Sequence, residues 1–150
     1  MITKKVNRYY CEFCKKSGCN ISVIRKHELA CTLNPNRICR VCKMDHGDWT
    51  QREGEQKPLT DLLVLLPDPS SYLVSDRWGE GFSNTLTDIV NSVLPKLREI
   101  SGDCPACIMA ALRQKGIPLP MVTDFNFTKE MKEIWDDINE TLRAKNYVCL

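Results

Sequence analysis

The chain has 150 residues, of which 43% are hydrophobic and 27% are charged, and its formal net charge is +2. This composition is ordinary for a globular protein and excludes a chain that is disordered throughout. No run approaches the roughly 18 apolar residues that cross a bilayer, and the charged start lacks the apolar segment of a secretory signal. We therefore expect a cytoplasmic protein without a membrane partner.

Cysteine and charge are unevenly used along the chain. The nine cysteines favour metal over disulfides, because cytoplasmic thiols stay reduced. Residues 1–43 carry ten basic against two acidic residues, a net charge of +8, and the remainder carries −6. Lysines can simply keep a small module soluble. A basic end on an acidic body nevertheless favours an anionic partner for that end.

The first element in the chain is the cluster Cys11-x2-Cys14-x12-His27-x3-Cys31. A Cys-x2-Cys pair forms a tight knuckle that points two sulfurs at one place, and ligands four residues apart share one face of a helix. The spacer suits a short hairpin followed by the first turns of a helix. Zinc takes four such ligands at tetrahedral corners, so the spacing predicts a zinc site.

This segment resembles the ββα zinc finger in its Cys-Cys-His-Cys variant, which implies a finger over residues 8–34. Tyr10 stands close to the position of a family aromatic residue, and Ile24 stands where the family keeps an apolar residue under the helix. Four positions after the second cysteine the family usually has an aromatic residue, and here that residue is Gly18. We therefore expect a thin finger core that takes contacts from the rest of the protein.

Between the finger and the long helices, connecting structure is expected. Residues 47–58 are polar and predict a loop. Residues 59–67 contain the longest apolar stretch and predict a short buried helix or strand that ends at Pro67. Pro69 and the two serines after it predict a turn.

A helix is predicted over residues 82–100, where apolar side chains recur with the helical period for about five turns. Ser83 is a suitable N-cap, and Pro95 is expected to kink the helix because it lacks an N–H. Gly102 is expected to end the segment.

Two more helices are expected in the C-terminal part. Residues 104–115 predict a helix that opens with the CPAC knuckle and has Gly116 at its C-cap. An extended connector, residues 117–122, leads to a last helix that Thr128 caps. Its apolar stripe is expected to lie in the core and comprises Met131, Ile134, Trp135, Ile138 and Leu142.

The remaining knuckles, Cys39-x2-Cys42 and Cys104-x2-Cys107, predict a second zinc site of four cysteines across an insert of 61 residues. Closing so long a loop costs only logarithmically more than closing a short one. A structural zinc site contributes roughly 10–16 kcal/mol at neutral pH, so the metal outweighs that cost. We therefore expect two zinc ions.

Other ligand sets stay open at this point. The knuckle at residues 11–14 could pair with that at 39–42 in a zinc ribbon, although this leaves more cysteines unused. Cys19 could replace a ligand in the first site, and His46 could enter the second. Alternatively Cys19, His46 and the tail residue Cys149 are a spare thiol, a surface imidazole and a second spare thiol.

Together these elements predict an α+β protein that is mostly α. A ββα-like finger is expected to join a helical domain, residues 35–150, that the four-cysteine zinc site holds together. Two longer runs, HELACTLNPNRICRVC and CPACIMAALRQKG, are similar to small zinc-finger proteins of unknown function from bacteriophages. That resemblance implies a location in the host bacterial cytoplasm and indicates no activity.

The basic finger favours nucleic-acid binding, most simply to DNA. If its helix enters a major groove, counting back from His27 places Asn20, Val23 and Lys26 at the base edges. One finger reads only about three base pairs, so a dimer or shape readout would be needed for specificity. Phosphates would be held by Lys15, Lys16, Arg25, Arg37 and Arg40.

The alternative is a protein-interaction module that acts on a host or viral protein. A distant third is a thiol–disulfide oxidoreductase built on CPAC, but residues 98–103 lack the apolar strand that such a fold places before the motif. The sequence has only two histidines to act as general bases, and it has no glycine-rich phosphate loop. We therefore expect no enzyme activity and no small-molecule substrate, and the oligomeric state is left open.

Overall fold

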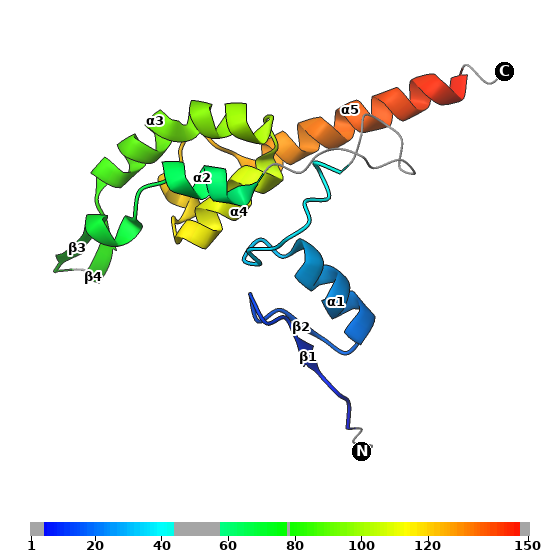
Figure 1. Cartoon of the computed structure of the whole chain (residues 1–150), viewed down its shortest axis with the longest axis horizontal. Helices are drawn as coiled ribbons and strands as arrows, with labels where there is room; N and C mark the ends of the chain where they lie inside the picture. Colours follow the sequence, from blue (N-terminus) through cyan, green and yellow to red (C-terminus); the bar gives the residue numbers. More distant parts are fainter. Residues whose placement is uncertain (1–4, 44–57, 78, 148–150) are drawn as a thin grey trace.

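The computed structural model describes residues 5–43, 58–77 and 79–147. The fold is α+β with helices predominating, as expected, and Figure 1 shows a small N-terminal unit beside a helical body. The predicted loop at residues 47–58 and the residues His46 and Cys149 lie outside this description, apart from Pro58. In chain order the elements are β1 (Tyr9–Tyr10), β2 (Ser17–Gly18), α1 (Ile21–Ala30), α2 (Leu59–Leu65), η1 (Pro69–Tyr72), β3 (Leu73–Asp76), β4 (Gly79–Phe82), α3 (Asn84–Ser101), α4 (Pro105–Lys115), η2 (Leu119–Met121) and α5 (Phe127–Tyr147).

The N-terminal unit has the ββα order that the finger resemblance implies. Strands β1 and β2 pair antiparallel, with Tyr9 opposite Gly18. Helix α1 begins after Asn20, whose side-chain oxygen accepts hydrogen bonds from the backbone N–H groups of Ser22 and Val23. This cap satisfies donors that would otherwise lack an intrahelical partner.

The finger core is small, and its aromatic residue is not the expected one. Buried Ile24 packs with two cysteines, and Tyr9 rather than Tyr10 contacts this cluster, because Tyr10 is 60% exposed. Adjacent strand residues point to opposite faces, so only one of the two tyrosines can face the helix. A Cβ atom on Gly18 would lie 3.4 Å from Ile24 Cδ1. The hairpin backbone at Gly18 therefore lies close to the Ile24 side chain of α1.

The helical body is built around α4. The α4 residues Ile108, Ala111 and Leu112 are fully buried, and α2 and α3 pack against them. Within residues 59–67, predicted as a helix or a strand, helix α2 covers Leu59–Leu65, and Leu62 is fully buried.

Helix α3 closely follows its prediction, with one difference at its start. Ser83 occupies the N-cap position, although its side chain makes no capping hydrogen bond, and Gly102 ends the helix in the left-handed region at φ 62°. Phe82 does not begin the helix, because it pairs with Leu73 in the β3–β4 hairpin. Sequence reasoning missed this hairpin. Its turn depends on Gly79, whose φ of 128° disfavours other residues.

The C-terminal part differs from expectation in three places. The connector predicted to be extended contains the 3₁₀ turn η2. Helix α5 begins before Thr128, and Asn126 caps it by accepting a hydrogen bond from Lys129 N–H at 3.0 Å. The apolar stripe is not core: none of residues 127–144 is buried, and Trp135 is 38% exposed.

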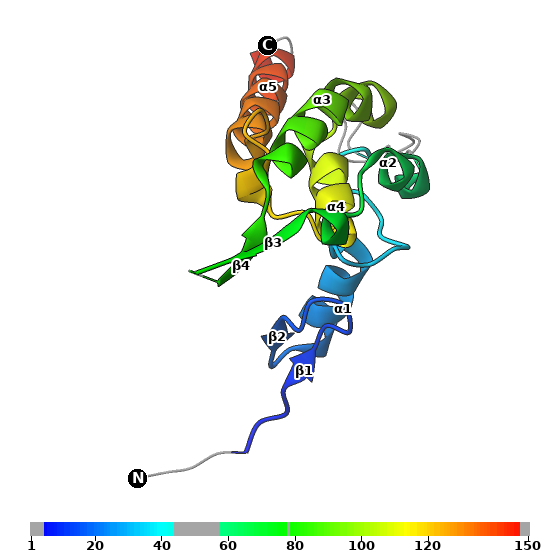
Figure 2. The same cartoon turned by 90° about the vertical axis from the view of Figure 1, so that its left-hand side faces the viewer.

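Figure 1 shows α5 extending away from the body, and Figure 2 shows the same helix foreshortened. A half-buried ion pair holds its first turn, because both carboxylate oxygens of Glu130 accept hydrogen bonds from Arg98 at 2.8 and 2.9 Å.

Of the helices in the described residues, none has both the length and the apolar character that a bilayer span requires.

Candidate metal centres

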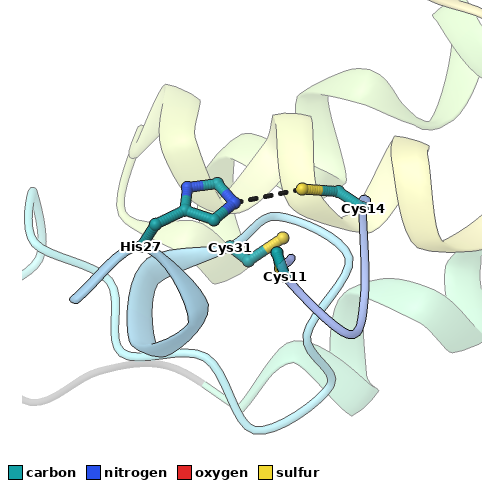
Figure 3. A group of neighbouring side chains, drawn as sticks. All are labelled: Cys11, Cys14, His27 and Cys31. Atoms are coloured by element: carbon teal, nitrogen blue, oxygen red, sulfur yellow. Dashed lines mark hydrogen bonds between the residues drawn. The ribbon is translucent and has the colours of Figure 1, made fainter. Parts of the chain in front are cut away.

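The first centre gathers Cys11, Cys14, His27 and Cys31, whose ligand atoms all lie within 4.8 Å of one another. Figure 3 shows the four side chains converging from the knuckle and from α1. His27 lies in the last turn of α1 and Cys31 is its C-cap residue, so the helix positions one half of the site. The predicted grouping is therefore confirmed.

The knuckle itself is shaped by backbone hydrogen bonds. Cys11 N–H donates to the Lys16 carbonyl at 2.8 Å, and Lys15 N–H donates to the Cys11 carbonyl at 3.1 Å. Lys15 adopts a left-handed conformation with φ 59°, which reverses the chain after Cys14. Two sulfurs thereby point toward α1.

The surroundings of the Cys14 and Cys31 thiols favour binding of a cation at the first centre. Burial alone raises the pKa of Cys14, but hydrogen bonds from Lys16 N–H and from His27 lower it from 9.0 to about 7. The Cys14 sulfur lies 3.0 Å from His27 Nε2. Burial raises the pKa of Cys31, so this thiol gains from a cation that replaces its proton.

The second centre joins parts of the chain that are more than sixty residues apart. Cys39 and Cys42 come from the segment after the finger, Cys104 is the N-cap residue of α4, and Cys107 lies in its first turn. The sulfur of Cys39 lies 3.7 Å from that of Cys104, and the sulfur of Cys42 lies 3.4 Å from that of Cys107. The expected pairing is confirmed, and the ribbon pairing is not the one that the structure forms.

The second centre is more deeply buried than the first. Cys39 and Cys107 are at most 1% exposed and Cys104 is 5% exposed. Hydrogen bonds from Cys104, Cys107 and Cys42 hold the pKa of the Cys39 thiol far below its usual range. A buried thiolate of this kind requires a compensating positive charge.

The residues fit tetrahedral metal ions. With zinc–sulfur distances near 2.3 Å, neighbouring sulfurs of a tetrahedral site lie about 3.8 Å apart, close to the separations in the second centre. Sets of three cysteines with one histidine and of four cysteines are typical of closed, structural zinc sites. The chemistry of the donors therefore suits zinc. The exposed Cys19 belongs to neither centre.

The finger contacts the body, as its thin core led us to expect, through residues that sequence reasoning did not identify. Gln114 donates from its side-chain nitrogen to the carbonyls of Thr32 and Asn34, each at 3.0 Å, and Arg113 donates to the Thr32 hydroxyl at 3.0 Å. Asn34 is buried and donates to the Glu28 carbonyl at 2.8 Å. Polar residues near the end of an amphipathic helix give no sequence signal for such a contact.

Seven of the eight residues predicted to contact nucleic acid have exposed side chains on the finger or beside it: Lys15, Lys16, Asn20, Val23, Arg25, Lys26 and Arg40. The eighth, Arg37, differs from its prediction. It is only 5% exposed, and its Nη1 lies 3.8 Å from the Cys107 sulfur. A guanidinium in this position is directed toward the second centre and not toward a phosphate in solvent.

No family model matches this chain, and comparisons with curated proteins and with solved structures find no match. The resemblances to ββα zinc fingers and to bacteriophage proteins therefore remain predictions from the sequence, while the two metal-binding clusters rest on the geometry above.

Proposed function

We propose that the protein is a zinc-stabilised nucleic-acid-binding protein whose helix α1 contacts duplex DNA. One observation carries this proposal. Helix α1 begins at Ile21, so Asn20, Val23 and Lys26 are the residue before the helix and its third and sixth residues. ββα fingers read bases with these positions, and all three side chains here are exposed.

Each of the three residues has a suitable base partner. Lys26 can donate to guanine O6 and N7, and Val23 can contact the methyl group of thymine. The side-chain oxygen of Asn20 is occupied by the helix cap, at 2.9 Å from Ser22 N–H. Its amide NH₂ remains to donate to a base acceptor, so a bidentate contact with adenine is not expected.

Basic side chains beside α1 supply the phosphate contacts. Arg40 donates from Nη2 to the Lys26 carbonyl at 3.1 Å, which holds its guanidinium along the helix. Arg25, Lys15 and Lys16 are also exposed on the finger. Four phosphate contacts would give a plot of log affinity against log salt a slope of about −3.6.

In this proposal the two zinc ions are structural, and the protein has no catalytic role. The CPAC cysteines serve as metal ligands, because Cys104 and Cys107 lie buried within the second centre. A thiol that exchanges disulfides needs solvent access, which this burial denies. The predicted location is the cytoplasm, that of the bacterial host if the protein belongs to a phage.

The proposal is tested by fluorescence anisotropy with a labelled DNA duplex and zinc-loaded protein across a salt series. The variant Arg25→Ala/Lys26→Ala should bind at least tenfold more weakly, since it loses a base contact and a phosphate contact. The matched control Lys129→Ala/Lys132→Ala removes two exposed lysines of α5 and should bind like the wild type. Absence of duplex binding by the wild type at low salt would refute the proposal.

The second candidate is docking to another protein, and one observation favours it. Leu29 is 56% exposed and Ile38 is 38% exposed, and the two residues adjoin because Ile38 N–H donates to the Leu29 carbonyl at 2.7 Å. An exposed apolar pair beside basic residues suits an acidic protein surface. A photocrosslinking side chain at Leu29 distinguishes the candidates, because it yields protein adducts only if a protein docks there.

A further inference from the structure

Arg37 is a buried cation at the junction between the finger and the body. It lies between Asn34 and Cys39, on the segment that leaves the finger, and it is 5% exposed. Its Nη1 approaches the sulfur of Cys107, which is 70 residues away in sequence, to 3.8 Å. An arginine side chain stays charged at any physiological pH, so its burial is costly unless negative charge lies nearby.

The second centre provides that negative charge. Four thiolates around a divalent cation carry a net charge of −2, whereas three thiolates and a neutral imidazole carry −1. The four-cysteine centre is also the more deeply buried of the two, with Cys39 at 0% and Cys107 at 1% exposure. An excess of negative charge in the interior is as unfavourable as an isolated buried cation. Each group therefore compensates the other.

We propose that Arg37 is an outer-shell residue of the second metal centre, where its guanidinium donates to the Cys107 thiolate and offsets the charge of the four sulfurs. This inference rests on the metal-binding part of the proposed function and is independent of DNA binding. It replaces the phosphate-binding role that the basic composition of the segment indicates.

The proposed contact has a chemical consequence at the sulfur. A hydrogen bond from a cation draws electron density from a metal-bound thiolate and so makes the sulfur a weaker base and a weaker nucleophile. Protonation and alkylation, both of which release a zinc ligand, then become slower. The segment that carries Arg37 also carries Cys39, so retention of the metal and attachment of the finger to the body depend on one another.

The test compares variants of the full-length, zinc-loaded protein by titration with a metal chelator, with both ions counted. Arg37→Met retains the side-chain methylenes and removes the charge, and we expect the second ion to bind about 10- to 100-fold more weakly. The first ion should be unaffected. The control Arg40→Met lies on the same segment but is exposed, and it should retain both ions like the wild type.

A second pair of variants keeps the test decisive if Arg37→Met does not fold. Arg37→Lys preserves the charge and Arg37→Gln preserves only a neutral donor, so the lysine variant should retain the second ion more strongly. Cobalt-substituted protein gives a separate readout, because loss of the cation should shift the sulfur-to-metal charge-transfer band.

Equal retention of the second ion by the lysine and glutamine variants, or wild-type retention by a folded Arg37→Met, would overturn the inference. In the latter case the guanidinium would only fill space. Failure of the wild-type protein to bind a second ion is a different result, because it would refute the metal-binding part of the proposed function itself.

Discussion

The finger and the helical body each contain a metal-binding cluster but depend on it to different degrees. In the finger the buried apolar cluster consists of Cys11, Ile24 and Cys31, so two of its three members are metal ligands. In the body three cysteines of the second centre belong to a larger core, to which α2, α3 and α4 all contribute large aliphatic side chains. A bound metal ion would therefore replace a hydrophobic core in the first region and supplement one in the second.

The two centres also differ in access to solvent. Cys14 and His27 are only partly buried, and Cys14 lines an open hollow of about 520 Å³ that Leu33 and Arg113 also border. Three of the four cysteines of the second centre are buried. Chelators and protons thus reach the first centre more easily, and the comparison can be tested by removing metal, by acidification and by substitution.

Chelation of both ions should have the largest effect and should separate the two regions. Each structural site contributes on the order of 10 kcal/mol, and the finger has little else to hold it together. Hydrogen exchange should show that residues 9–31 lose protection completely, while α3 and the later part of α4 remain protected. Persistent protection in the finger after metal removal would contradict the comparison.

Acidification should release the first ion before the second. The folded-state pKa of Cys14 is about 7, below its ordinary value of 9.0, so its contribution to stability is present at alkaline pH and is lost as pH falls through 7. Below that value, each proton that displaces the ion weakens binding about tenfold per pH unit. Native mass spectrometry between pH 8 and pH 5 should detect a form with one ion, and simultaneous loss of both ions would disagree with this order.

Some features of this layout could be predicted from the sequence, and others could not. The first ligand set, the separate knuckles of the second and helices α3 and α4 follow from local spacing, because knuckles, apolar periodicity and the C-cap residues Gly102 and Gly116 act over a few residues. The incomplete burial of the α5 stripe and the burial of Arg37 depend on where distant segments meet. Composition cannot distinguish a solvated arginine from one that faces thiolates.

Matched core truncations should give an intermediate effect. Ile24→Ala and Leu97→Ala each remove a large buried side chain, at a cost of about 2–5 kcal/mol. In the finger this loss removes the one large aliphatic residue of the cluster, so exchange should rise locally over α1 while the body stays folded. Leu97→Ala should instead lower the global free energy of unfolding, measured by urea denaturation. Global unfolding by Ile24→Ala would show that the regions are not separable.

Loosening the junction should have the smallest effect. Gln114→Ala removes two hydrogen bonds to the finger, each with a net value of about 1 kcal/mol. Both metal centres should remain loaded, while residual dipolar couplings should report greater motion of the finger relative to the body. Unchanged couplings would mean that the second centre and the remaining Arg113–Thr32 hydrogen bond suffice to fix the orientation, and Lys132→Ala serves as the exposed control.

Native mass spectrometry of the purified protein at neutral pH tests the central claim most directly, because it counts the metal ions bound to each folded chain. Two closed centres predict a mass increase equal to two zinc ions. A strong chelator should remove both ions, and the finger should then unfold. A folded chain that carries fewer than two ions would contradict the account.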